Sequence, residues 1–351
     1  MIFRQLFDQT SSTYTYLLAD ETTREAVIID PVYEQSRRDT ALIHELDLKL
    51  LYTLDTHCHA DHVTGSWLMR HHTGCKIACA KVIGAENTDT ALIHGDKIRF
   101  GHCSLSARAT PGHTDGCISF VTEDQTMVFT GDALLIRGCG RSDFQQGSPH
   151  RLYHSIKEQI FTLPDDCAVY PGHDYAGRTS STVAEEKQYN PRLGGSANED
   201  DFVGYMSAMQ LPHPKHLAVA LPANMRCGMP ENGEIPAEPD WAPVTNTFAG
   251  FSEISPDWVA RNRQAVHILD VRNEQEIAVD HGTIVGSQLI PLDSLRDRIS
   301  EIPSEKPVVT LCRSGRRSAL AVGILQNAGF ERVANVAGGM LRWQEEGLSL
   351  Q

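Results

Sequence analysis

At 351 residues the chain exceeds the size that one hydrophobic core usually organises, so two domains are expected. The hydrophobic content of 41% and the aromatic content of 7% are typical of globular proteins, and no apolar run is long enough to cross a bilayer. The formal net charge of −14, from 45 acidic and 31 basic side chains, would repel a phosphate backbone and argues against nucleic acid as a partner.

The N-terminal segment MIFRQLFDQTSSTYTYLL contains no charged leader followed by an apolar core and a small-residue cleavage site. The nine cysteines are spread along the chain without a Cys-x-x-Cys pair, which favours reduced thiols over a zinc ribbon or a disulfide framework. We therefore expect a cytoplasmic protein with no role at a membrane.

Short β-rich runs recur in the N-terminal half of the chain, and each ends in Gly, Pro or a polar cluster. They are residues 48–56 (LKLLYTLDT), 106–110 (SARAT), 126–132 (TMVFTGD) and 167–174 (CAVYPGHD). Each run delivers a His or an Asp just past the end of the predicted strand. Residues from distant parts of the chain can therefore converge at one edge of a sheet.

The tightest group of these side chains lies in the stretch THCHADH, residues 56–62. The residues that could bind a metal here and downstream are His57, His59, Asp61, His62, His113, Asp132 and His173. Imidazole nitrogens and carboxylate oxygens suit zinc, iron or manganese. The spacing alone leaves open whether two zinc ions activate water or one iron handles dioxygen. Cys58 lies between two histidines, and because adjacent side chains diverge we assign it to packing.

Taken together, THCHADH, PGHTDG, TGD and PGHD resemble the motifs of the metallo-β-lactamase superfamily across residues 1–235. The resemblance implies an α/β fold, an αββα sandwich with the metal at the strand ends. It is less specific for chemistry, because the hydrolytic branch, including glyoxalase II, uses the same residue types to hold two metals.

Three further segments resemble the persulfide dioxygenases within that superfamily. They are residues 131–147 (GDALLIRGCGRSDFQQG), 170–193 (YPGHDYAGRTSSTVAEEKQYNPRL) and 221–228 (LPANMRCG). The resemblance implies one Fe(II) per chain, bound by His57, His113 and Asp132. Two imidazoles and one carboxylate leave adjacent positions of an octahedral iron open for a sulfur and for dioxygen. The remaining potential ligands, His59, Asp61, His62 and His173, would then orient the iron ligands and move protons.

The substrate implied by this resemblance is glutathione persulfide, which dioxygen oxidises to sulfite with release of glutathione. An anionic tripeptide calls for cationic and hydrogen-bonding side chains beside the iron. The residues in matching motifs that we expect to contact it are Arg141, Tyr175, Asn224, Met225 and Arg226.

A change of composition marks the expected domain boundary. Residues 231–248 (ENGEIPAEPDWAPVTNTF) are rich in Pro, Glu and Asn and have no period of 2 or 3.6, so we place a linker at residues 236–250. Residues 251–351 alternate helical and strand patterns. This alternation predicts a small α/β domain with a mostly parallel sheet covered by helices.

Residues 306–326 (KPVVTLCRSGRRSALAVGILQ) predict a strand, a loop that begins at Cys312, and a helix. Backbone N–H groups of the loop, the helix N-terminus and the side chains of Arg313, Arg316 and Arg317 would favour a thiolate, so Cys312 is the expected nucleophile, with Arg313 and Arg317 beside it. The segment resembles a rhodanese domain. Related phosphatases use a loop one residue longer, and the shorter loop suits a sulfane sulfur better than a phosphate.

Both halves thus point to persulfide chemistry, and the expected enzyme is a persulfide dioxygenase joined to a thiosulfate sulfurtransferase. The expected partners are small molecules: glutathione persulfide, thiosulfate, sulfite and glutathione. The direction of sulfur transfer at Cys312 stays open, and a homodimer is implied by family alone. The alternative is a binuclear zinc glutathione thioesterase of the glyoxalase II type whose C-terminal domain carries sulfur or docks a partner.

Overall fold

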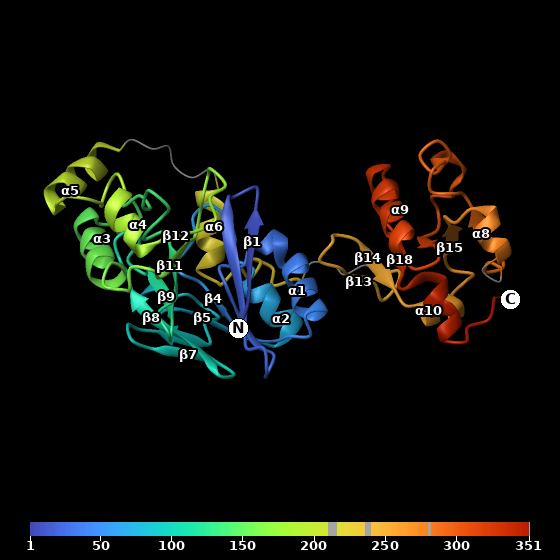
Figure 1. Ribbon diagram of the computed structural model, residues 1–351, viewed down its shortest axis with the longest axis horizontal. Coiled ribbons are helices and arrows are strands. Elements are labelled where there is room, and N and C mark those ends of the chain that lie inside the picture. Colours follow the sequence, from blue (N-terminus) through green and yellow to red (C-terminus); the bar gives the residue numbers. More distant parts are fainter. Residues whose placement is uncertain (210–215, 236–239, 280–281, 351) are drawn as a thin grey trace. The chain divides into compact units, whose positions relative to one another are not determined.

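The computed structural model describes residues 1–209, 216–235, 240–279 and 282–350, and it divides into two compact units, Met1–Ile235 and Pro236–Gln351 (Figure 1). The predicted linker at 236–250 begins with residues 236–239, which lie outside the described part. It also contains a two-residue strand, β13 (Thr245–Asn246), which belongs to the sheet of the second unit.

The first sheet of the N-terminal unit has the strand order β1-β2-β3-β4-β5-β6. Its strands are β1 (Ile2–Asp8), β2 (Thr13–Ala19), β3 (Glu25–Ile29), β4 (Lys49–Leu54), β5 (Lys76–Ala80) and β6 (Thr90–Leu92). The strands from β1 to β3 pair antiparallel, and those from β3 to β6 pair parallel. Parallel pairing brings the carboxyl ends of β3 and β4 to the same edge.

The second sheet has the order β12-β11-β10-β9-β8-β7. Its strands are β7 (Lys97–Phe100), β8 (Cys103–Ala109), β9 (Ile118–Thr122), β10 (Met127–Gly131), β11 (Ala168–Pro171) and β12 (Ser181–Thr182). Within this sheet β10 and β11 are parallel, and the remaining neighbours are antiparallel.

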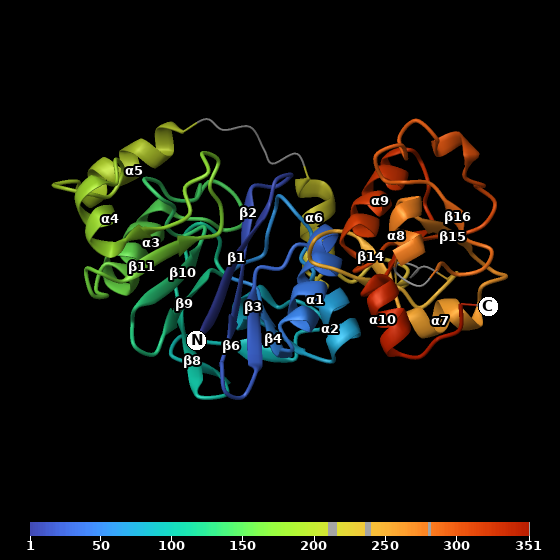
Figure 2. The same ribbon diagram turned by 45° about the vertical axis from the view of Figure 1, so that its right-hand side comes forward.

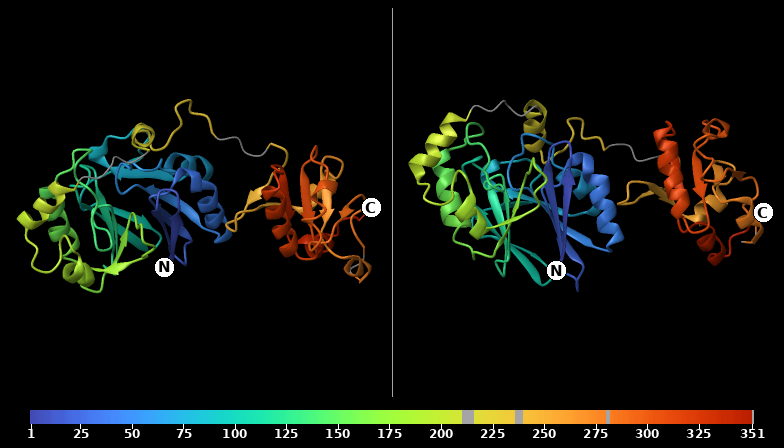
Figure 3. Two further views of the ribbon diagram at one scale, coloured as in Figure 1. Left: turned by 90° about the horizontal axis from the view of Figure 1, so that it is seen from above. Right: turned by 45° about the horizontal axis from the view of Figure 1, so that its top comes forward.

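A continuous apolar core lies between these two sheets. Tyr16, Ile29 and Leu54 from the first sheet pack with Phe120 and Phe129 from the second, and all five are fully buried. Tyr and β-branched or aromatic side chains of this kind fit the pleated, buried faces of strands. Seen from above, the two sheets form the middle layers of the unit (Figure 3).

Helices cover the outer face of each sheet. On the first sheet they are α1 (Ser36–Glu45) and α2 (Ser66–Thr73), with the short turns η1 (Tyr33–Gln35) and η2 (Lys81–Ile83) nearby in sequence. On the second they are α3 (Pro149–Ser155), the π-helical turn η3 (Ile156–Ile160), α4 (Val183–Tyr189) and α5 (Glu199–Ala208), and α6 (Leu217–Asn224) follows in the chain. The predicted αββα sandwich is therefore confirmed.

The second unit has one sheet with the order β13-β14-β18-β17-β15-β16. After β13 its strands are β14 (Ser252–Ile254), β15 (His267–Asp270), β16 (Gln288–Leu289), β17 (Val308–Leu311) and β18 (Val333–Val336). Its helices are α7 (Pro256–Arg261), α8 (Glu274–Val279), α9 (Arg316–Asn327) and α10 (Gly339–Glu345), with the turn η4 (Ile299–Glu301). All pairs except β13–β14 are parallel, which confirms the mostly parallel sheet.

Alternate residues of the central strands in this unit face two apolar clusters. Leu269 and Val308 pack with residues of α9, whereas Ile268 and Val309 pack with residues of α7 and α10, including Trp343. Figure 2 shows these helices flanking the sheet. In the described part of both units, no helix combines the length and the apolar character needed to cross a membrane.

Candidate active sites

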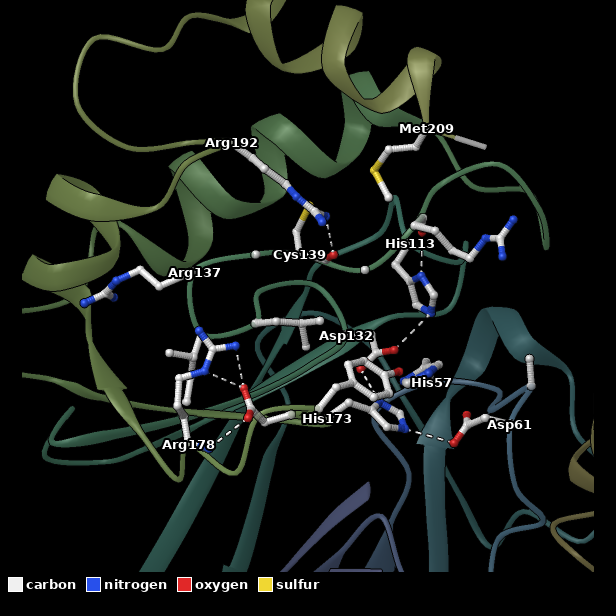
Figure 4. A pocket seen from close by; sticks show the side chains of 18 of the residues that line it. His57, Asp61, His113, Asp132, Arg137, Cys139, His173, Arg178, Arg192 and Met209 are labelled. Carbon is white, nitrogen blue, oxygen red and sulfur yellow. Dashed lines mark hydrogen bonds and ion pairs between the residues drawn. The ribbon is translucent and has the colours of Figure 1, made fainter. Parts of the chain in front are cut away.

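The potential metal ligands of the N-terminal unit follow the ends of four strands. His57 comes shortly after β4, His113 after β8, Asp132 directly after β10, and His173 after β11. The structure brings these four side chains together, and Figure 4 shows His57, Asp132 and His173 close to one another with the ring of His113 directed at Asp132. The predicted convergence is therefore present, but it joins two sheets and not one, because β4 belongs to the first sheet and β8, β10 and β11 belong to the second.

His57, His113 and Asp132 offer one ligand atom each within 4.8 Å of one another. The Nδ1–H of His113 donates to the carbonyl oxygen of Arg141 at 2.6 Å, so its Nε2 carries the free lone pair. That Nε2 lies 3.7 Å from Oδ2 of Asp132. One imidazole nitrogen is thereby directed at the carboxylate in a geometry that a metal ion between them would use.

A hydrogen-bonded chain orients the ring of His57 in the same way. Asp30, which follows β3, accepts from the backbone N–H of Thr56 at 2.7 Å and from its hydroxyl at 2.8 Å. Because the Thr56 hydroxyl donates its proton to Asp30, its oxygen accepts from Nδ1–H of His57 at 2.9 Å. Burial, with His59 beside it, holds the pKa of His57 well below its ordinary value. A neutral ring with a free Nε2 is the form that binds a metal.

A second donor group lies beside the first and consists of His59, Asp61 and His62. Nε2 of His59 pairs with Asp30 at 3.1 Å, and Nδ1 of His62 pairs with Asp61 at 2.9 Å. The other ring nitrogen of each histidine is buried and makes no hydrogen bond. The residues for a second metal are thus physically close together.

His173 lies between the two groups and links their carboxylates. Its Nδ1 is 2.6 Å from Asp132, and its Nε2 is 2.9 Å from Asp61. Burial alone would lower the pKa of His173, but the two carboxylates outweigh it and raise the pKa well above its ordinary value. Both ring nitrogens of His173 are thus directed at carboxylate oxygens, and neither is directed at the first donor group's metal position in this arrangement.

A cavity of about 280 Å³ opens beside the first donor group (Figure 4). Its lining includes His57, His113, Asp132 and His173, the guanidinium-bearing residues Arg137, Arg141, Arg178 and Arg192, and the rings of Phe144 and Tyr175. Guanidinium cations on the wall of a cavity that has potential metal ligands at its floor suit an anionic substrate.

Two of the predicted substrate contacts line this cavity. Arg141 packs over the ring of Phe144 at 4.8 Å and pairs with Asp143 at 2.6 Å, and Tyr175 is 75% exposed and stacks against His173 at 6.0 Å. Asn224, Met225 and Arg226 are not among the residues that line it.

Asn224 instead supports the metal-binding loop. Its amide donates to the carbonyl oxygens of His59 and His62 at 2.9 and 2.8 Å, and its side-chain oxygen accepts from the N–H of Thr64 at 2.8 Å. Because these hydrogen bonds satisfy both the nitrogen and the oxygen of its amide, the Asn224 side chain can be buried. In this arrangement Asn224 positions the ligands rather than contacting the cavity.

Three residues of the site, Asp30, Arg178 and Arg192, were not among the predicted ones. Asp30 could have been found, because it follows the apolar run AVII as Asp132 follows TMVFTG. Both arginines lie in the family-like segment 170–193, but only the fold brings them to the cavity wall, where Arg178 donates to Asp174 and Arg192 donates to the carbonyl oxygen of Cys139.

The glycine at position 140 provides a test of the first donor group. A Cβ at Gly140 would lie 2.4 Å from the carbonyl oxygen of Asp132 and 2.8 Å from Nδ1 of His113, so both residues would have to move. We expect Gly140→Ala to weaken metal binding by about tenfold or more, as the loss of ligand orientation does elsewhere. Metal affinity measured by competition with a chelator tests this.

Gly138→Ala is the matched control for that variant. A Cβ there would find its nearest neighbours at 3.8 and 4.0 Å, which is ordinary contact. Its metal affinity should equal that of the unmodified chain. Equal affinity in Gly140→Ala would show that His113 and Asp132 are not held in a metal-binding geometry by this contact.

Cys312 of the second unit begins the loop between β17 and α9. The residue is 1% exposed, and its thiol accepts from the hydroxyl of Ser318 at 3.2 Å. Burial alone would raise the pKa of Cys312, but hydrogen bonds from the Ser318 hydroxyl and from backbone N–H groups of Ser318, Ser314 and Arg317 outweigh it and lower the pKa. A lowered pKa makes more of the nucleophilic thiolate at neutral pH.

The loop is held in place by α10 and by an ion pair. The N–H groups of Met340 and Leu341 donate to the carbonyls of Cys312 and Arg313, both at 2.9 Å. Arg317 donates to both carboxylate oxygens of Glu276 at 2.7 and 2.5 Å. Arg317 therefore shapes the loop through Glu276 and adds positive charge near the thiol.

Ser318→Ala should raise the pKa of Cys312, because it removes the hydroxyl that stabilises the thiolate. A hydrogen bond to a charged group corresponds to about one to two pH units. The rate of alkylation of Cys312 by iodoacetamide, followed by mass spectrometry as a function of pH, should therefore reach its midpoint at higher pH in the variant. An unshifted midpoint would leave the hydroxyl without a role in thiolate formation.

Comparison with known proteins gives independent findings for both units. The model of the metallo-β-lactamase superfamily matches residues 9–173, and that of the rhodanese-like domain matches residues 255–346. The mouse and human proteins named "Persulfide dioxygenase ETHE1, mitochondrial" are each 55% identical over 230 residues, covering 65% of this chain and 89% of theirs.

Two solved structures are similar as well. ETHE1 from Myxococcus xanthus is 51% identical with a TM-score of 0.63 and covers 65% of this chain and 100% of its own. A metallo-β-lactamase from Staphylococcus aureus is 25% identical with a TM-score of 0.61, and the match covers 96% of this chain and 98% of that one. The second match extends over both units of the chain.

Proposed function

The chain belongs to the persulfide dioxygenase family of the metallo-β-lactamase superfamily and has a C-terminal rhodanese-like domain, and we propose that it both oxidises glutathione persulfide and transfers sulfane sulfur. In the first reaction glutathione persulfide, dioxygen and water give glutathione and sulfurous acid. In the second, Cys312 carries the sulfur as a persulfide.

The donor set of the first site suits one ferrous ion. His57 and His113 each have one nitrogen satisfied by a protein acceptor and one directed inward, and Asp132 supplies the carboxylate. A ferrous ion held there would supply adjacent open coordination positions and redox chemistry for a sulfur and dioxygen. His173, held between Asp132 and Asp61, keeps a proton next to the carboxylate ligand.

The basic wall of the cavity supports an anionic thiol substrate. Glutathione carries two carboxylates, and Arg141, Arg178 and Arg192 line the cavity whose base holds the metal ligands. Guanidinium groups bind carboxylates through paired, charge-assisted hydrogen bonds. We assign the recognition of the peptide to these arginines, and the exposed ring of Tyr175 to its outer contact.

The sulfur transfer would proceed in two balanced displacements. The Cys312 thiolate attacks the outer sulfur of thiosulfate, forms a Cys–S–S⁻ persulfide and releases sulfite. A glutathione thiolate then attacks the outer sulfur of that persulfide, which forms glutathione persulfide and regenerates the Cys312 thiolate. Both steps can run in reverse, so the direction follows the concentrations of thiosulfate and sulfite.

The observation that carries the dioxygenase proposal is the inward-facing His57, His113 and Asp132 set in a chain of this family. Its test is metal analysis of protein purified without oxygen, together with oxygen uptake on glutathione persulfide. We expect about one iron per chain, because two histidines and one carboxylate together bind one ferrous ion. We also expect one dioxygen to be consumed for each sulfite formed.

The second donor group, His59, Asp61 and His62, supports the competing hydrolase. Two zinc ions per chain, hydrolysis of S-lactoylglutathione and no oxygen uptake would establish that function instead. The cytoplasmic location and the homodimer stay predictions, and the mammalian relatives are named as mitochondrial proteins.

A further inference from the structure

Two buried thiols meet behind the metal-binding loop. Cys79 lies near the end of β5 and Cys227 follows α6, and they are 3% and 2% exposed. Both sulfurs contact the hydroxyl of Thr88, at 3.2 Å from Cys79 and 3.6 Å from Cys227, and the Cys227 thiol donates to the carbonyl oxygen of Glu86 at 3.1 Å. Two sulfurs that share one hydroxyl neighbour lie close enough for local movement to bring them to bonding distance.

A small cavity gives both sulfurs a common space. It measures about 10 Å³, and its lining includes Cys79, Cys227 and Cys58 together with His57 and His59 of the metal-binding loop. This is about the room that one water-sized molecule occupies. A small oxidant such as a peroxide that entered this space would lie against both sulfurs.

Cys227 belongs to the segment that supports the metal-binding loop. Asn224, three residues before it, donates to the carbonyl oxygens of His59 and His62. Cys227 itself accepts from the N–H of Trp67 at 2.9 Å and has a φ of 56°, a left-handed conformation that is uncommon for a residue other than glycine. A bond that fixes Cys227 would therefore also restrain the loop that carries His57.

We propose that Cys79 and Cys227 form a peroxide-sensitive dithiol whose disulfide fastens the segment 224–228 to β5 and slows loss of the metal. One peroxide oxidises the pair: one thiolate attacks a peroxide oxygen and becomes a sulfenic acid with release of water. The second thiol displaces the sulfenic oxygen, which leaves as a second water, and the S–S bond forms. The two thiols supply both electrons and both protons.

The electrostatic surroundings of the two thiols fit these unequal roles. The proximity of Cys227 lowers the pKa of Cys79, whereas the proximity of Cys79 and burial raise the pKa of Cys227, whose thiol donates to the carbonyl oxygen of Glu86 at 3.1 Å. Cys79 is thus the attacking thiolate and Cys227 the resolving thiol. Burial raises the pKa of Cys58 to about 12, so this third thiol stays protonated and takes no part.

The test starts from the full-length, metal-loaded, reduced protein treated with a small excess of hydrogen peroxide. Diamide serves as a second oxidant that makes no hydroxyl radicals. After alkylation of free thiols and proteolysis, mass spectrometry should find the peptides of Cys79 and Cys227 joined and two hydrogens lighter. Because the disulfide would restrain the segment that holds the metal-binding loop, release of the metal to a chelator should slow by about fivefold or more on oxidation.

Cys79→Ser and Cys227→Ser should each lose both the joined peptide and the slower release. Cys75→Ser is the matched control, because Cys75 is also buried next to β5 but packs in the cluster under α1 and α2; it should behave as the unmodified chain. A different partner for Cys79, separate sulfinic acids on the two cysteines, or unchanged release from a fully joined protein would each overturn the proposal. The peptide analysis of the unmodified chain decides this even if a serine variant does not fold.

Discussion

Asp132→Asn is expected to lose its tightly bound metal and its oxygen uptake on glutathione persulfide. The change removes the negative charge that faces Nε2 of His113 at 3.7 Å and that accepts from His173 at 2.6 Å. Loss of a partner outside the ligand set already costs about ten- to a hundredfold in affinity or activity, so loss of a ligand should cost more than about a hundredfold. Metal content after dialysis and the rate of oxygen consumption measure both effects.

Asp61→Asn is the informative comparison for that variant. Asp61 also pairs with His173, at 2.9 Å, but belongs to the second donor group. If one iron occupies the first group, Asp61→Asn should retain about one metal per chain and part of its oxygen uptake. Loss of one of two bound metals in Asp61→Asn, or full oxygen uptake in Asp132→Asn, would contradict the assignment of the mononuclear site.

Cys312→Ser is expected to abolish sulfur transfer between thiosulfate and glutathione while oxygen uptake on added glutathione persulfide continues. Serine cannot form the persulfide, and removal of a covalent nucleophile lowers rates by about a thousandfold or more. The measurement is thiosulfate made or consumed during turnover, with mass spectrometry of the Cys312 peptide for the added sulfur.

Cys103→Ser is the control for nonspecific thiol chemistry, because Cys103 is partly exposed in β8 of the other unit. It should transfer sulfur at the unmodified rate. Unchanged transfer in Cys312→Ser would refute Cys312 as the nucleophile. A Cys312 thiol that takes no sulfur from thiosulfate or glutathione persulfide would favour a carrier or docking module that accepts sulfur from a protein donor.

Much of the architecture followed from local patterns. The apolar runs before His57, Asp132 and His173 predicted strands, and the polar residues just past their ends predicted a site at a sheet edge, which in the fold joins two sheets. The strand, glycine-containing loop and helix around Cys312 were likewise readable, because residues close in sequence make the β17–α9 turn.

The residues that would contact the substrate were harder to predict from the sequence. Arg141 and Tyr175 line the cavity. Asn224, which was predicted to contact the substrate as they were, is instead buried against the backbone of residues 59–64. A motif identifies which residues matter to a family but does not say which way each side chain points. That direction depends on packing around α6, which sequence periodicity does not describe.

The sequence by itself predicted two α/β domains, a metal site rich in histidine and aspartate, and a loop that begins at a cysteine. These features were predictable because strand patterns and turn residues depend on only a few neighbouring positions. Tertiary contact was needed to reveal how the ligands are held. The hydrogen bonds from Thr56 to Asp30 span 26 residues, and the one from Asn224 to the carbonyl of His59 spans 165. Only the tertiary structure likewise brings Cys79 and Cys227 to one cavity. Residues so far apart in sequence have no common local pattern, and they become neighbours only when the chain packs.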